Sequence, residues 1–302
     1  MYLRNGRTIR GVLLALSITP CVHAALPAVQ KVVSAASFKP NLAWGALSTI
    51  FGTDLGSVAS ATSLPLPLQL GGAQLYVCNQ KYLGPDCVRA GLIYVGPSQI
   101  NFLMPNVTKP VAEYNGTDWN TSFWVSVNGR ESASIVQQVN PTAVGVFTMG
   151  YMCPIGFDGK PTACPDAWDT KYGTNYSKVI RAAITDSTGR LVTAENPIHR
   201  SGYYTLWLTG SGSYGTPNTN TAYIASDVHI TLNQEHAPLE QFILFAGPSP
   251  QFPGLGQVNF SVSEIPPCGP YVAQEFIAYV RAFNSYDFRF SFDTMSLPIV
   301  CK

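Results

Sequence analysis

The chain has 302 residues and a formal net charge of +1 at pH 7, and only 12% of its residues are charged. A net charge this small excludes the basic field that holds nucleic acids. An apolar fraction of 46% excludes a solvated, disordered polymer. The 26 Gly, 23 Pro and 12% aromatic residues favour a turn-rich β protein.

The first 24 residues have the layout of a secretory signal peptide. Three arginines come first, residues 11–18 are apolar, and small residues precede a cleavage point after Ala24. The apolar run is too short to span a bilayer. We therefore expect an exported protein, extracellular or at the cell surface, with the periplasm as an alternative and no transmembrane segment in the mature chain. An uncleaved anchor and a lipoprotein acylated at Cys21 are further alternatives.

Six cysteines lie beyond residue 24, and an even number in an exported chain predicts disulfides. They are Cys78, Cys87, Cys153, Cys164, Cys268 and Cys301. Proximity favours pairing each one with its nearest neighbour along the chain, although proximity alone does not decide the connectivity. A metal site is the rival interpretation. It is disfavoured because the chain has no C-x-x-C pair, so we expect no metal and no cofactor.

The chain contains an internal repeat. Residues 96–105 contain Gly-Pro-Ser followed by Gln-Ile-Asn-Phe, and residues 247–266 contain Gly-Pro-Ser and, after a gap, Gln-Val-Asn-Phe. Residues 45–56 resemble residues 202–212 at nearly the same offset. Two matches at one offset predict a duplicated domain.

The predicted fold is all-β, with two tandem immunoglobulin-like β-sandwich domains at residues 25–140 and 141–302. Apolar and polar residues alternate between turns rich in Gly, Pro and Asn, as in half-buried antiparallel strands. The clearest of these segments are residues 123–127, 228–232, 257–262 and 288–292, and residues 203–209 are a further apparent strand. The Asn128-Gly129 dipeptide after the first segment predicts a hairpin turn. Residues 271–283 also have helical spacing, so a short helix is an alternative there.

Residues 149–180 have no counterpart in the first half of the chain. We interpret them as a disulfide-pinned surface loop inserted into the second domain. Asp158, Asp166 and Asp169 lie in this loop, and Ca²⁺ prefers such oxygen ligands. A solvated acidic loop is the other interpretation, because the spacing matches no EF-hand.

Several ordered blocks run from about residue 32 to residue 300. They are residues 33–38, 50–56, 70–72, 94–102, 144–148, 208–212, 245–247 and 256–259. Together they resemble the Solibacter-type C-terminal domain family of secreted acidobacterial proteins. The resemblance implies an exported module of paired β-sandwiches with no catalytic residues to carry over. The cysteines and residues 149–180 depart from the family pattern and suggest a specialised role.

Motifs for catalysis are weak in this chain. Residues 210–215 match G-x-G-x-x-G, but the residues after them are a poor helix start, so a glycine-rich turn is favoured over a nucleotide site. A Ser-His-Asp triad would have to use His199, His229 or His236, and no serine lies in G-x-S-x-G. The acidic residues are scattered, which disfavours a paired-carboxylate glycosidase. We therefore expect no enzymatic activity.

Aromatic residues gather in the predicted insertion and near the Asn128-Gly129 turn. The candidate binding residues are Tyr151, Trp168, Tyr172, Tyr176, Trp119 and Trp124. Exposed rings stack on sugars or anchor protein partners, whereas core packing is the alternative for any one of them. The predicted function is a secreted, non-enzymatic surface protein, an adhesin or an extracellular filament subunit. Its partners would be other copies of itself, a surface protein or a polysaccharide. A carbohydrate-binding module is the alternative.

Overall fold

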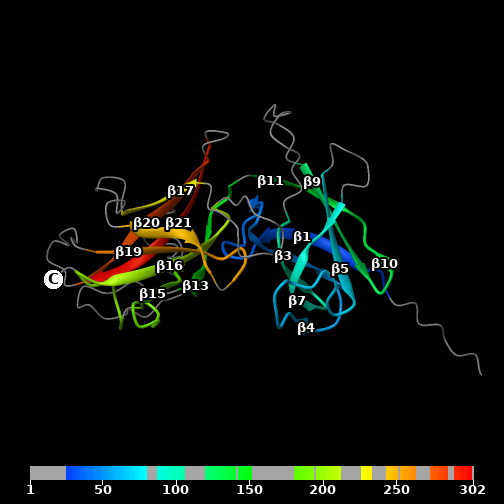
Figure 1. Ribbon diagram of the computed structural model, residues 1–302, viewed down its shortest axis with the longest axis horizontal. Helices are drawn as coiled ribbons and strands as arrows, with labels where there is room; N and C mark the ends of the chain where they lie inside the picture. Colours follow the sequence, from blue (N-terminus) through cyan, green and yellow to red (C-terminus); the bar gives the residue numbers. More distant parts are fainter. Residues whose placement is uncertain are drawn as a thin grey trace, which may run out of the picture.

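The computed structural model describes part of the chain in detail. The described residues are 25–79, 87–105, 120–140, 142–151, 180–193, 195–211, 226–232, 243–250, 252–262, 273–284 and 289–300. Each regular element in these ranges is a β-strand, so the protein is all-β, as predicted. Figure 1 shows the strands in two bodies that lie side by side along the long axis of the molecule. No helix in the described ranges is long and apolar enough to cross a membrane.

The first sandwich consists of two sheets. One sheet has the order β1 (Ala28–Ser34), β3 (Leu47–Thr53), β8 (Gln99–Leu103), β7 (Gly91–Gly96) and β4 (Ala59–Ser60). The other has the order β2 (Leu42–Ala43), β11 (Ile135–Asn140), β9 (Asn120–Val127), β5 (Ala73–Asn79) and β6 (Cys87–Arg89). The short β10 (Arg130–Glu131) pairs with β9.

Alternating side chains of these strands fill the space between the two sheets. In β9, Phe123 and Val125 are buried, whereas Ser122 and Trp124 between them are half-buried on the opposite face. The largest fully buried side chains of this core include Leu75, Leu92, Ile100, Phe102 and Phe123. Burial of this apolar surface is the main driving force for the sandwich. The predicted alternation of residues 123–127 is confirmed.

The turn after β9 has the predicted chemistry. Asn128 and Gly129 have φ values of 50° and 79°, which is the left-handed pair that a type I′ hairpin turn requires. The turn returns the chain into β10. Asn128 also donates its backbone N–H to the carbonyl of Gly72, over 2.9 Å, which ties the hairpin to the start of β5.

The second sandwich also consists of two sheets. One has the order β12 (Gly145–Val146), β16 (Tyr203–Thr209), β19 (Gly256–Ser261) and β18 (Ile243–Pro248), with β15 (Ile184–Asp186) beside β16. The other has the order β13 (Thr148–Tyr151), β14 (Ile180–Ala182), β21 (Arg289–Val300), β20 (Ala273–Asn284) and β17 (Ser226–Leu232).

The alternative of a short helix over residues 271–283 is wrong. β20 occupies Ala273–Asn284 and pairs with β21 along its whole length and with β17 on its other side. Pairing with two neighbouring strands satisfies the backbone N–H and C=O groups of this segment. Its place in the sheet therefore overrides the helical spacing of its apolar residues.

Three strands in each sandwich correspond to one another. The order β3-β8-β7 in the first sandwich matches β16-β19-β18 in the second. The register also corresponds: Thr49 lies opposite Asn101, and Thr205 lies opposite Asn259. Both triplets break register at one place, next to Tyr94 in β7 and next to Phe245 in β18. This is the arrangement expected from a duplication, which stays a prediction together with the domain boundaries at residues 25–140 and 141–302.

The connection within the triplets differs between the two sandwiches. Pro97 and Ser98 alone join β7 to β8, whereas residues 249–255 join β18 to β19. We call residues 249–255 the docking loop, because its described part reaches the first sandwich. Leu255 packs against a cluster that contains Leu47 and Leu103. A Cβ atom at Gly254 would lie 2.6 Å from Leu103 Cδ1, so the loop and the first sandwich are in close contact.

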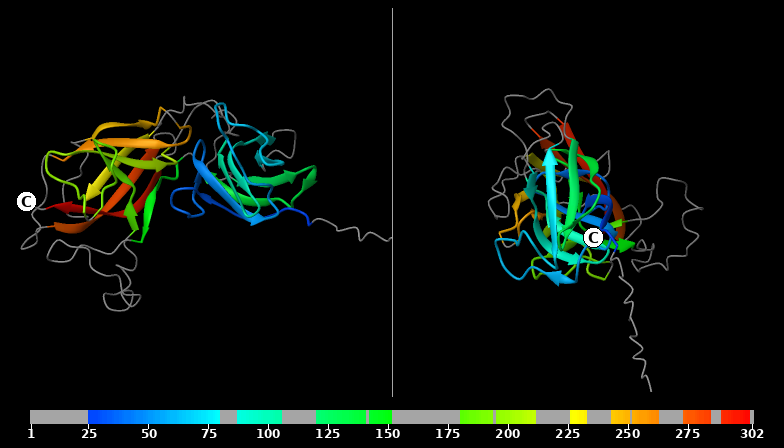
Figure 2. Two further views of the ribbon diagram at one scale, coloured as in Figure 1. Left: turned by 90° about the horizontal axis from the view of Figure 1, so that it is seen from below. Right: turned by 90° about the vertical axis from the view of Figure 1, so that its right-hand side faces the viewer.

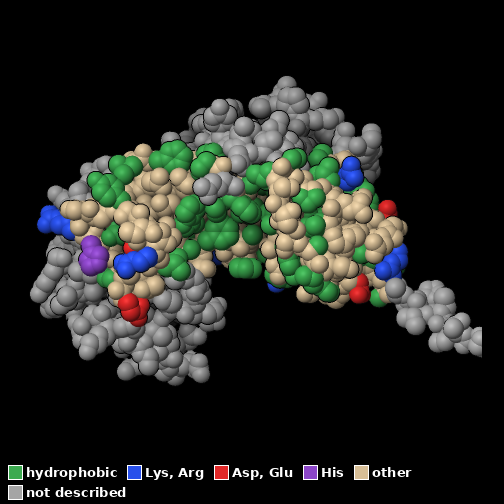
Figure 3. All heavy atoms as spheres, turned by 60° about the horizontal axis from the view of Figure 1, so that its bottom comes forward, with side chains coloured by type: hydrophobic (Ala, Val, Ile, Leu, Met, Phe, Trp, Pro, Cys, Tyr) green, Lys and Arg blue, Asp and Glu red, His purple; other side chains and the backbone are tan. Residues whose placement is uncertain are grey.

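A buried threonine completes the junction between the sandwiches. Thr209 is 1% exposed. Its hydroxyl accepts the backbone N–H of Leu47 over 2.8 Å and donates to the carbonyl of Gly254 over 2.6 Å. Figure 2 shows the two sandwiches meeting end to end, and Figure 3 shows hydrophobic side chains gathered in the hollow between them. The two bodies are therefore joined by a packed contact as well as by the chain.

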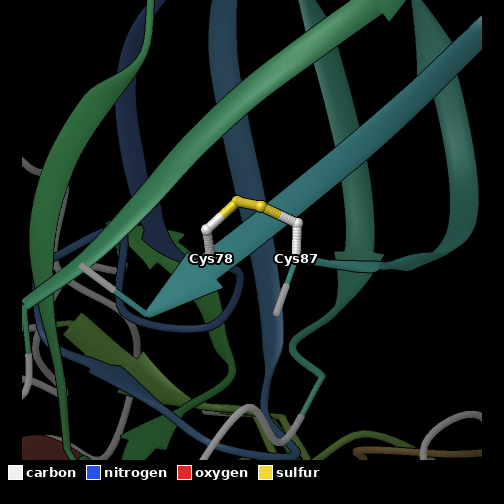
Figure 4. The surroundings of a disulfide bond; sticks show 2 residues. All are labelled: Cys78 and Cys87. Carbon is white, nitrogen blue, oxygen red and sulfur yellow. A yellow bond between two sulfur atoms is a disulfide. The ribbon is translucent and has the colours of Figure 1, made fainter. Parts of the chain in front are cut away.

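One predicted disulfide is confirmed. Cys78 on β5 lies opposite Cys87 on β6, and their sulfur atoms are bonded at 2.02 Å. Figure 4 shows the bond linking the two strands. Cys153, Cys164, Cys268 and Cys301 lie outside the described residues, so their pairing stays a prediction.

Removal of this disulfide is expected to lower the free energy of unfolding of the first sandwich by roughly 2–3 kcal/mol, because the cross-link restricts the unfolded chain between the two cysteines. The measurement is urea denaturation of the Cys78→Ser/Cys87→Ser variant beside the wild type. An unchanged urea midpoint would contradict the expectation. A Ser122→Ala variant, changed on the neighbouring strand, serves as the control for a general effect of substitution at this end of the sheet.

Candidate binding surface

An aromatic pair lies on the outer face of the sheet that contains β5 and β9. Tyr76 and Trp124 lie directly opposite each other on these strands. Their rings are parallel, with an interplanar angle of 1° and a centroid distance of 3.9 Å, and both side chains are half-buried. Each ring therefore covers one face of the other and keeps the two in a fixed position.

On the side away from β5, β9 pairs with β10 and β11. Ser126 pairs with Glu131 and Phe123 pairs with Ile135, so three residues on this side oppose two on β9. This β-bulge places small residues beside Trp124: Ser132, Ala133 and Ser134.

Several uncharged polar groups lie beside the pair, and the exposed Arg89 on β6 lies directly opposite Tyr76. The Tyr76 hydroxyl donates to Gln74 Oε1 over 2.7 Å, and Gln74 Nε2 donates to Gln69 Oε1 over 3.0 Å. Ser122 and Ser126 flank Trp124 on β9. Aromatic rings beside amides and hydroxyls form a surface that packs against the C–H groups of a sugar and hydrogen-bonds its hydroxyls.

Two ionisable side chains, Asp186 and Tyr204, take part in hydrogen bonds that hold a turn in place. The Asp186 carboxylate accepts hydrogen bonds from the side chains of Thr188, Asn196 and Arg190, at 2.6, 3.0 and 3.3 Å. The Thr188 bond, followed by the Asn196 bond, holds the pKa of Asp186 well below its usual range. Burial raises the pKa of Tyr204, whose hydroxyl accepts the backbone N–H of His199 over 2.7 Å. These bonds fix the turn between β15 and β16.

The described part of the chain contains no candidate metal centre. No group of three His, Cys, Asp or Glu side chains within the described ranges is placed to hold a metal ion. Asp158, Asp166 and Asp169, the predicted alternative Ca²⁺ ligands, lie outside those ranges, as does His236.

Among the predicted binding aromatics, Trp124 lies in this surface. Tyr151 is the last residue of β13. Trp119, Trp168, Tyr172 and Tyr176 lie outside the described residues. The sequence analysis missed Tyr76. Nothing in the sequence near Tyr76 indicates that its strand pairs with β9.

Comparison with known proteins identifies no family for the chain. No protein-family model matches it, and no curated protein matches it. Among solved structures, the protein in a crystal structure with xylogluco-oligosaccharide has 11% sequence identity to this chain and a TM-score of 0.25. The match covers 91% of this chain and 41% of that one. Domains 4–9 of the surface layer protein SbsC are 13% identical, with a TM-score of 0.24, over 91% of this chain and 31% of that one.

A third similar structure is the sialic acid binding region of a Streptococcus sanguinis SK1 adhesin bound to 3'sLn. It is 12% identical, with a TM-score of 0.19, over 92% of this chain and 78% of that one. The chain thus spans about two fifths of the first structure and about a third of the second. Likenesses at these TM-scores carry no argument about function, which therefore rests on the chain itself.

Proposed function

We propose that the protein is an exported, non-enzymatic binding protein of the adhesin type, and that it binds carbohydrate through the outer face of its first sandwich. The observation that carries the proposal is the stacked Tyr76–Trp124 pair among uncharged amides and hydroxyls. The predicted signal peptide supports export, and the Cys78–Cys87 disulfide suits an oxidising compartment.

The proposed ligand is a neutral sugar, although Arg89 opposite Tyr76 places one cation beside the pair. Gln74, Ser122 and Ser126 supply hydrogen-bonding groups without charge. Binding would therefore depend on stacking and hydrogen bonds, and it would change little with ionic strength. Salt-insensitive binding separates this mode from attachment to an acidic surface.

The Trp124→Ala variant is expected to bind neutral polysaccharide about tenfold more weakly or worse, because loss of a central aromatic contact costs about 2 kcal/mol or more. The measurement is retardation in native gels that contain galactomannan, xylan or mixed-linkage β-glucan. Trp124→Phe is the matched control, since it keeps a ring that stacks on Tyr76, and it should bind within a few-fold of the wild type. Equal retardation of Trp124→Ala and the wild type would refute the proposed site.

Self-assembly into filaments is the second candidate, and one observation favours it. Among the described strands, β18 lies at the edge of its sheet, and Leu244 on it is 61% exposed. An edge with exposed apolar side chains is a template for pairing with another chain. Sedimentation velocity of the wild type and Leu244→Lys checks this candidate: concentration-dependent polymers that Leu244→Lys abolishes would favour assembly, and a monomer at all concentrations would exclude it.

A further inference from the structure

The two corresponding strand triplets carry the same polar side chains in the same places on their outer faces. Thr49 Oγ1 donates to Asn101 Oδ1 over 3.1 Å, and Thr205 Oγ1 donates to Asn259 Oδ1 over 3.1 Å. We call the two clusters the twin patches. The first patch consists of Thr49, Phe51, Tyr94, Gln99 and Asn101, and the second consists of Thr205, Trp207, Phe245, Gln257 and Asn259.

Aromatic rings occupy equivalent positions in both patches. One ring lies opposite the glutamine, and another lies opposite the asparagine on the next strand. The first set is Phe51 and Trp207, and the second set is Tyr94 and Phe245. In each patch, two planar amides and a hydroxyl thus lie between two rings, and none of the ten side chains is charged.

The hydrogen bonds inside the patches leave donors for a ligand. Asn101 Oδ1 accepts from Thr49 and also from Gln99 Nε2, over 2.7 Å, which uses both of its lone pairs. The Asn101 Nδ2 hydrogens then have no partner among the described residues. The same holds for the Nδ2 group of Asn259, whose oxygen accepts from Thr205. Each patch therefore presents an amide that is fixed in orientation by its threonine and still able to donate.

The outer faces of the triplets share three polar residues, and the cores beneath them share a phenylalanine, Phe102 and Phe260. The threonine, glutamine and asparagine are identical in the two patches. Other residues on the inner faces differ: Ile50 corresponds to Leu206, Ile100 to Val258, and Val95 to the half-buried Ala246. The glutamine and the asparagine are only half-buried in both patches. Because substitutions outside the core change stability little, core packing does not explain why these two residues match. A shared ligand does.

We propose that the twin patches are two binding sites for a neutral, hydroxyl-rich polymer, each taking one segment of a polysaccharide. The amide groups would hydrogen-bond neighbouring hydroxyls of a sugar, and the rings would pack against its C–H groups. Two like sites in one chain fit a ligand that repeats, because joined sites raise the affinity for a polymer above that of either site alone. The inference deepens the proposed function by adding two sites away from the Tyr76–Trp124 pair.

The two patches are expected to differ in strength. The Lys31 ammonium lies 4.8 Å from the centroid of the Phe51 ring and occupies one of its faces. Thr49 is also buried, whereas Thr205 is half-buried. The second patch, with Trp207, is therefore the more open one, and it should bind more tightly.

The test uses Asn101→Asp, Asn259→Asp and the double variant, because aspartate keeps the acceptor for the threonine and loses the amide donors. In gels that contain galactomannan, xylan or mixed-linkage β-glucan, we expect the double variant to lose at least tenfold in affinity, and Asn259→Asp to lose more than Asn101→Asp. Isothermal titration calorimetry, with hexasaccharides prepared from the polymer that binds, measures the number of ligands bound per chain. The two patches should contribute two bound hexasaccharides in the wild type and one in each single variant. Ser187→Ala, an exposed change in the turn after β15, is the control.

Comparison with Trp124→Ala separates the two proposals. If Trp124→Ala loses binding while the double aspartate variant retains it, the twin patches are overturned and the proposed function stands. If only the double variant loses binding, the twin patches stand and the Tyr76–Trp124 surface is not the site. A wild type that binds none of the three polymers overturns both. Circular dichroism of each variant shows that it is folded.

Discussion

Phe102→Ala is expected to lower the free energy of unfolding of the first sandwich by about 3–5 kcal/mol. Phe102 is fully buried between the sheets, and its removal deletes apolar contacts and leaves a cavity. Phe260 holds the corresponding position in β19 and is also fully buried. Phe260→Ala should have the same effect on the second sandwich.

Hydrogen exchange read by mass spectrometry assigns each loss to its own sandwich. Peptides from β3 and β8 should lose protection in Phe102→Ala, and peptides from β16 and β19 should lose it in Phe260→Ala. Phe102→Leu is the matched control, because it keeps most of the volume and should cost only about 1–1.5 kcal/mol. Equal loss of protection in both sandwiches from either variant would show that they unfold as one unit.

Thr209→Val is expected to weaken the junction between the sandwiches by about 2–4 kcal/mol. Valine fills the same volume but cannot hydrogen-bond, so the Leu47 N–H and the Gly254 carbonyl lose their partner in a buried setting. Each buried polar group left without a partner costs about 1–3 kcal/mol. The expected result is faster hydrogen exchange at the start of β3 and in the docking loop, with the core strands of both sandwiches still protected.

Thr209→Ser is the control for this variant. It keeps the hydroxyl and loses only a methyl group, so it should stay within about 1 kcal/mol of the wild type. Small-angle scattering provides a second readout, since a loosened junction increases the radius of gyration. A Thr209→Val protein with unchanged exchange and unchanged scattering would show that the two hydrogen bonds do not hold the junction.

The features that were predicted correctly depend on neighbours in the chain. The Asn128-Gly129 turn follows from two residues that adopt positive φ. The strand at residues 257–262 follows from the alternation of its own side chains. The Cys78–Cys87 disulfide joins cysteines separated by nine positions.

The features that were missed depend on contacts between distant segments. Tyr76 meets Trp124 because β5 pairs with β9, and this pairing is decided by packing of the whole sandwich. The helical spacing in residues 271–283 was misleading for the same reason, since the partners of β20 determine its conformation. Thr209 showed no signal, because its importance comes from an approach between two sandwiches.

The docking loop makes the contact between the sandwiches asymmetric, because the first sandwich has a two-residue turn at the corresponding place. In the place of that loop, the first sandwich has the tight turn at Pro97 and Ser98, which supplies no counterpart of Leu255. At the other end, Leu47 is 6% exposed beneath the second sandwich, whereas its counterpart Tyr203 is 58% exposed and uncovered. Among the described residues, the contact between the sandwiches therefore has no equivalent that would join one chain to the next, so an array of chains would use a different contact.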